Sequence, residues 1–116
     1  MARAATTTDV FNAIAEPRRR QIIEVLARRG ALAVGTLVVA VGLPQPAVSK
    51  HLGVLREVGL VSVDKSGRQR VYRLNPEELK SVYDWAKAFE RFWSHQLDRI
   101  KLRAEAKART KTDAST

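Results

Sequence analysis

The stretch PQPAVSKHLGVLREVGLVSV, residues 44–63, has the pattern of a helix with two unlike faces. Val48, Leu52 and Leu55 recur at helical spacing and form one apolar stripe. The opposite face carries mostly short or lightly polar residues where a surface helix usually has long charged ones: Gln45, Pro46, Ser49, Lys50 and Gly53. We therefore predict a helix from about Gln45 to Val58 whose outer face stays low enough for another molecule to approach its backbone.

A second helix is predicted to precede this one across a tight turn. Residues 34–41, VGTLVVAV, contain four valines, which favour a strand by propensity. The flanks favour a short helix, because Gly42 and Leu43 lead directly into the segment that starts with Pro44. A helix, a glycine-containing turn and another helix make a helix-turn-helix, so we predict a helix over 34–41.

Two further helices are predicted upstream. A short one extends from about Thr8 to Ala15. The next begins at Pro17, which suits a first helical turn, and ends at Gly30. Residues 1–7 are small and polar, and we expect them to be disordered.

Residues 60–74 are predicted to form a β-hairpin, because apolar and polar residues alternate on both sides of Ser66 and Gly67. Asn75 then caps a last, long helix. The order α-α-α-α-β-β-α is that of a winged helix-turn-helix, a mainly α fold with a small β-hairpin, and we predict this domain over residues 8–101. Residues 102–116 are expected to be a frayed or disordered basic tail.

The charge balance favours a polyanionic partner. Lysine and arginine number 21 against 12 aspartate and glutamate residues, which gives a net charge of +9. The hairpin region 61–74 alone holds four basic residues and one acid. The chain has no cysteine and no apolar segment that could span a bilayer, so we expect a cytoplasmic protein that binds double-stranded DNA and no membrane.

The DNA contacts are expected first on the helix over 45–58. Gln45 lies at its N-terminal end, where recognition helices touch bases, and Ser49 can donate or accept a hydrogen bond. Lys50 is suited to a guanine edge or a phosphate, and His51 either contacts a phosphate or packs structurally. Pro46 and Arg56 complete this surface.

Further DNA contacts are expected outside that helix. Arg68 lies at or beside the hairpin tip and Arg70 follows it, within reach of a DNA backbone or a narrow minor groove. Arg18, Arg19 and Arg20 begin a helix, where cations oppose the helix dipole. One of them, represented by Arg18, is expected to contact a phosphate or form a salt bridge.

Three segments carry a resemblance to a known family: EPRRRQIIEVL, LPQPAVSKHLGVLREVGLVSV and GRQRVYRLNPEEL. Over about residues 10–100 the chain resembles the ArsR/SmtB family of winged helix-turn-helix repressors, in its branch without sensor cysteines. The resemblance implies a homodimer, paired through the first and last helices, that binds a palindromic operator and represses transcription. The chain departs from the family's pattern at Gly53, where a basic residue is common, and at Val38 and Val39, where polar residues are common.

The last helix carries too many large aromatic residues for one exposed helix. With the first helix, it is expected to supply the dimer interface: Phe11, Trp85, Phe89, Phe92, Trp93 and Ile100. The near-neutral charge of residues 75–100 fits an interface between subunits better than a DNA surface.

Two other functions are considered beside this one. A metal- or ligand-responsive repressor is the first, although His95 and Asp98 would supply only half of a metal site. A winged helix that binds another protein is the second. No catalytic residues, no enzyme activity, no metal and no cofactor are predicted, because the chain shows no nucleophile motif or phosphate loop. The sequence leaves the operator, any small-molecule effector and the choice between repressor and activator open.

Overall fold

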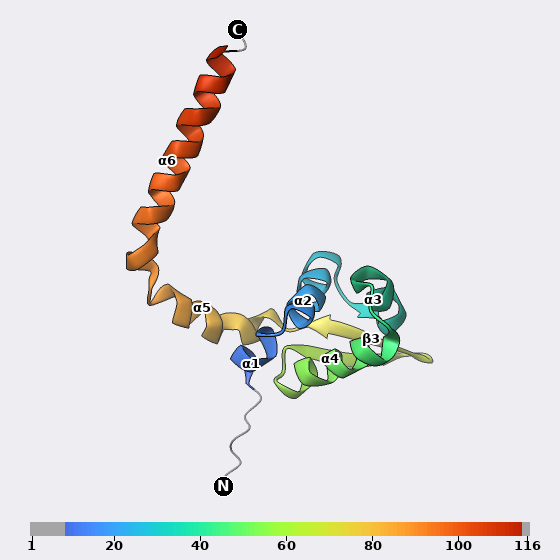
Figure 1. The fold of residues 1–116 in the computed structure, drawn as a ribbon. Helices are drawn as coiled ribbons and strands as arrows, with labels where there is room; N and C mark the ends of the chain where they lie inside the picture. The colour runs from blue at the N-terminus through green and yellow to red at the C-terminus, as the bar shows by residue number, and fades with distance from the viewer. Residues whose placement is uncertain (1–8, 115–116) are drawn as a thin grey trace. The chain divides into compact units, whose positions relative to one another are not determined.

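The structure is a computed structural model that describes residues 9–114. The chain divides into two compact units, Met1–Val82 and Tyr83–Thr116, which are described one at a time (Figure 1). The predicted disorder of residues 1–7 lies outside the described residues. None of the helices in the described part is both long and apolar enough to cross a membrane.

The first unit begins with two capped helices. In α1, Val10–Ile14, the Asp9 side chain accepts a hydrogen bond from the Asn12 amide. In α2, Pro17–Arg29, Glu16 caps the Arg18 amide in the same way. Gly30 ends α2 with a φ of 85°, which suits glycine because it has no Cβ. Both helices were predicted from the sequence.

The helix-turn-helix follows as predicted. Helix α3 spans Val34–Val41 and α4 spans Gln45–Glu57, and the turn between them contains Gly42 in the left-handed conformation. The valine-rich segment forms a helix despite its strand propensity because Leu37 and Val41 are thereby buried against the neighbouring helices.

A short strand, β1 over Leu32–Ala33, was not predicted. It pairs antiparallel with β3, Gln69–Leu74, which in turn pairs with β2, Val61–Ser66. The expected hairpin is therefore part of a three-stranded sheet in the order β1-β3-β2. Two residues are too few for an alternating pattern, so the sequence carried no recognisable signal for β1.

The hairpin turn lies one residue later than predicted. Ser66 pairs with Gln69, so the turn residues are Gly67 and Arg68. Gly67 alone of the two has a positive φ, which is the arrangement of a type II′ turn. Arg68 consequently stands at the tip of the hairpin.

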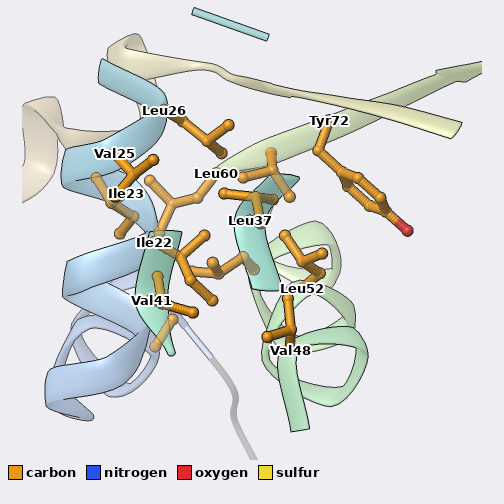
Figure 2. Packing of buried hydrophobic residues seen from close by; sticks show 13 residues of the cluster. Ile22, Ile23, Val25, Leu26, Leu37, Val41, Val48, Leu52, Leu60 and Tyr72 are labelled. Atoms are coloured by element: carbon orange, nitrogen blue, oxygen red, sulfur yellow. The ribbon is translucent and has the colours of Figure 1, made fainter. Parts of the chain in front are cut away.

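The core lies between the helices and one face of the sheet. It contains aliphatic side chains from α2, α3 and α4 together with Leu60 and Val61 (Figure 2). Tyr72 of β3 lies at the edge of this cluster. All three residues of the stripe predicted on α4 are buried: Val48, Leu52 and Leu55.

The predicted single last helix is wrong, because the segment is divided into three. A 3-10 turn, η2 over Pro76–Leu79, leads into α5, Lys80–Lys87, and α6 spans Glu90–Ala114. Between α5 and α6 the amides of Ala88 and Phe89 bond three residues back, to Trp85 and Ala86. This tightening interrupts the α-helical ladder without any glycine or proline to mark it.

Helix α6 continues to Ala114, beyond the domain boundary predicted at residue 101. The segment contains no glycine or proline that would stop a helix, and it is rich in alanine, lysine and arginine, which favour helices. The fraying expected for residues 102–116 stays a prediction.

Candidate nucleic-acid interface

The outer face of α4 is exposed along its length. Gln45, Pro46, Ser49, Lys50, Gly53 and Arg56 are all accessible to solvent, whereas the opposite face is buried. A Cβ added to Gly53 would meet no atom within 4 Å, so the surface there is open. No other element of the same unit therefore covers the face of α4 that was predicted to be accessible to a partner.

The polar groups on this face have no partner in the described part of the chain. No hydrogen bond or ion pair occupies the side chains of Gln45, Ser49 or Lys50 there. Pro44 precedes α4 and gives its N-terminus no side-chain cap. These donors and acceptors are thus available to a partner molecule.

His51 is half-buried on the same helix. Its Nδ1 atom is buried and has no hydrogen-bond partner among the described residues. Any polar contact with DNA must therefore use Nε2, which is a donor when the neutral ring carries its proton there. Both roles expected for His51, packing and phosphate contact, are compatible with this position.

The wing, which is the hairpin formed by β2 and β3, presents cations on one face. Lys65 and Arg70 are directly paired across β2 and β3, so their side chains share a face of the sheet with Tyr72. Like charges in that arrangement repel each other, and within the described residues neither has an ion pair. Arg73 lies on the other face and forms a salt bridge with Asp64.

The wing, α4 and the start of α3 together line a cleft of about 610 Å³. It brings together four of the residues predicted to contact DNA: Gln45, Ser49, Arg68 and Arg70. The predicted residues that do not line it are Pro46, Lys50, His51, Arg56 and Arg18.

Sequence reasoning missed several residues of this cleft, among them Gly35, Thr36 and Tyr72. Tyr72 is brought there by the pairing of β1 with β3, and Thr36 by the position of α3 directly after β1. The unpredicted strand is thus the reason that these residues were not identified. The alternation of Arg70 and Tyr72 along one strand was the one available signal.

The three arginines at the start of α2 mostly serve the fold. Arg19 Nε donates to the Ala13 carbonyl at 2.6 Å, and Arg20 donates to the Ile14 carbonyl at 2.7 Å. These bonds satisfy carbonyls at the end of α1. Arg18 is exposed and donates to the Gln21 side chain at 3.1 Å, so its predicted contact with DNA stays a prediction.

All six residues predicted for the dimer interface are exposed large apolar side chains. On α1, Phe11 is 40% exposed. In the segment 85–100, the exposed fraction lies between 42% and 63% for Trp85, Phe89, Phe92, Trp93 and Ile100. Trp85 and Phe89 pack edge to face, with ring centroids 5.2 Å apart. Exposed apolar side chains in such number are typical of a surface that binds another protein, and the assignment of these residues to a dimer interface stays a prediction.

Among the described residues, no group of three or more histidine, aspartate or glutamate side chains is placed to hold a metal ion. His95 and Asp98, the pair considered from the sequence, are both exposed on α6.

Comparison with known proteins gives a consistent result. The model for bacterial regulatory proteins of the arsR family matches residues 16–63. The HTH-type transcriptional regulator Rv2034 of Mycobacterium tuberculosis is 40% identical over 87 residues, which cover 75% of this chain and 78% of that protein. The arsenical resistance operon repressor of Escherichia coli is 33% identical over 92 residues, which cover 78% of this chain and 75% of the repressor.

The fold is also similar to a solved structure. A solution NMR structure of a homodimeric winged helix-turn-helix DNA-binding domain, Mb0332 from Mycobacterium bovis, superposes with a TM-score of 0.58. It is 31% identical, and the match covers 74% of this chain and 81% of that one. The predicted winged helix-turn-helix is thereby confirmed.

Proposed function

This chain belongs to the arsR family of bacterial regulatory proteins, and we propose that it represses transcription as a homodimer on a palindromic operator. Membership makes it a DNA-binding transcriptional regulator with a winged helix-turn-helix domain. Its relatives are regulators, which confirms the prediction that the chain is not an enzyme.

The observation that carries the proposal is the surface formed by α4 and the wing. Gln45, Ser49 and Lys50 are exposed and have no partner in the described part of the chain. Arg68 and Arg70 face the same cleft as the start of α4. A helix of this width enters a major groove of about 12 Å, and the wing cations then meet the adjacent backbone.

The contacts divide by their chemistry. Gln45 is suited to pair with an adenine edge through its amide, and Ser49 to contact a neighbouring base. Lys50, Arg56, Arg68, Arg70 and Arg18 are suited to phosphates, which supply affinity and orientation for any sequence. We assign His51 a phosphate contact through Nε2 and Pro46 a close approach to the groove.

The homodimer follows from the exposed apolar surface and from the homodimeric relative. In this proposal α1 and the segment 85–100 of each subunit meet their counterparts. Two-fold symmetry then places two copies of α4 in successive major grooves about 34 Å apart, which requires a palindromic site. The protein would act where the DNA is, in the cytoplasm of a bacterium.

Selection from a pool of random DNA duplexes at physiological salt tests the proposal. We expect a palindromic consensus whose half-sites are separated by about 10 base pairs. Footprinting upstream of the protein's own gene would then locate a natural site, and transcription from it in vitro should fall as the protein is added. A pool without enrichment would mean that the winged helix binds another protein instead of a specific DNA site.

A further inference from the structure

The cleft between α3, α4 and the wing has the chemistry of an anion site. Its lining contains two guanidinium groups, Arg68 and Arg70, and no carboxylate. The hydroxyl-bearing residues Thr36, Ser49 and Tyr72 also line it. Hydrogen-bond donors and positive charges thus surround the cleft, and no negatively charged side chain lines it.

Tyr72 is the unusual member of this lining. It is only 7% exposed, yet its hydroxyl makes no hydrogen bond to any residue that the structure describes. Figure 2 shows the ring at the edge of the core, with the hydroxyl oxygen pointing away from the aliphatic side chains. The ring is buried while the hydroxyl opens to solvent at the cleft, where it can donate a hydrogen bond to a ligand.

The start of α3 lines the same cleft. Ala33 gives this helix no side-chain cap, and the first amides of any helix have no partner within it. Gly35 is in the first turn, where its φ is not positive and an added Cβ would meet nothing within 4 Å. The fold itself therefore does not require glycine at this position. Glycine would be required if a ligand has to come close to the backbone there, because it has no Cβ.

We propose that this cleft seats a phosphate group of the DNA backbone and that the Tyr72 hydroxyl donates a hydrogen bond to it. The first amides of α3 and the guanidinium of Arg70 hold the same phosphate. The inference rests on the proposed function and adds Tyr72, Thr36 and Gly35 to the interface. The contact fixes the position of the wing on DNA and reads no base.

The first test is Tyr72→Phe, which removes the hydroxyl and keeps the ring in the core. We expect DNA affinity to fall about tenfold for selected and random duplexes alike, because a hydrogen bond to a charged group is lost. The salt dependence should stay the same, because no cation is removed. Tyr83→Phe, at an exposed tyrosine outside the cleft, is the matched control and should bind as the unmodified protein does.

A second test locates the phosphate. Duplexes that carry one neutral methylphosphonate at a time are compared with both proteins. The unmodified protein should lose affinity at one backbone position in each half-site, and Tyr72→Phe should lose much less at that position, because the two changes remove the same contact. Additive losses at every position would overturn the assignment.

Gly35→Ala provides an independent variant. The thermal unfolding midpoint should be unchanged or higher, since alanine favours helix, while DNA affinity falls because the methyl group occupies the space of the phosphate. Normal DNA binding by both Gly35→Ala and Tyr72→Phe would overturn the inference and leave the proposed function intact. Failure of the unmodified protein to bind any duplex would instead refute the proposed function.

The same phosphate chemistry is also present in free anions. Inorganic phosphate is therefore titrated into the DNA complex at constant ionic strength, with chloride as the reference. A seat that takes a DNA phosphate also takes free phosphate, so inorganic phosphate should displace DNA more strongly than chloride does, and this excess should disappear in Tyr72→Phe. Inorganic phosphate that binds the protein without displacing DNA would assign the cleft to a free anion and overturn the DNA assignment.

Discussion

Gln45 begins α4, and its exposed amide has no partner in the described part of the chain. We expect Gln45→Ala to weaken operator binding by about 1–3 kcal/mol and to relax the preference at one base position. Titration of duplexes that differ at single positions measures both effects. An equal loss on every sequence would show that Gln45 does not read a base.

Gly53 is the position at which the outer face of α4 is barest. A side chain there would extend into open space. Gly53→Lys should therefore strengthen binding to all duplexes and make the logarithmic salt dependence steeper by about one unit. Gly53→Gln, of similar length without charge, separates the cation from the helix propensity that both variants gain. Equal slopes for the two variants would mean that the position faces no phosphate.

The burial or exposure of a single residue was predictable where it depends only on the residue's position around one helix. The 3.6-residue period alone gave both the buried stripe of α4 and its exposed face, and the structure agrees at Val48, Leu52 and Ser49. Tyr72 and Gly35 were not predictable, because their place in the cleft depends on a strand of two residues that pairs with β3.

The cations of the wing lie on two different surfaces. Arg68 at the tip lines the cleft, whereas Arg73 on the other face pairs with Asp64. Arg68→Ala should weaken binding to all sequences and reduce the salt slope by about one unit. Arg73→Ala changes the net charge equally and should alter the slope less. The same slope for both variants would mean that the wing acts only through the overall field of the protein.

Helix α3 has an apolar residue on its solvent side. Val39 is 82% exposed, while Leu37 on the same helix is fully buried. Val39→Gln should change the free energy of unfolding by less than about 0.5 kcal/mol, whereas Leu37→Ala should lower it by about 2–5 kcal/mol. Chemical denaturation of the two variants measures the contrast. A large loss for Val39→Gln would reveal that this side of α3 is covered in the native protein.

Elements were predictable where local signals were strong. Pro17 and Gly30 marked the ends of a helix, and the alternation from Val61 marked the hairpin. The interruption between α5 and α6 was not predictable, because it depends on hydrogen bonds that shift by one residue in a segment with an unbroken helical pattern.

The whole molecule is proposed to function as a pair of subunits, and Trp93 tests this. Trp93→Glu places a charge in the row of exposed aromatic residues and should yield monomers with a large loss of operator affinity, because the two half-sites are no longer bound together. Sedimentation measures the association. Leu102→Glu is the control, since nine residues along a helix of about 100° each place it on the opposite side. Dimers that survive Trp93→Glu would locate the interface elsewhere.

The guanidinium groups of Arg19 and Arg20 bear on how a change at the interface between two subunits would reach the DNA-binding helices. Helix α1 has only five residues, too few to persist on its own, and these two side chains hold its final carbonyls to α2. If Phe11 touches the second subunit, as proposed, any strain between subunits passes through this clamp to α2, and α2 packs against α3 and α4. Substituting these arginines would then weaken the link between subunit pairing and operator binding without altering α4 or the wing, although Ala13 would still anchor α1 in the core.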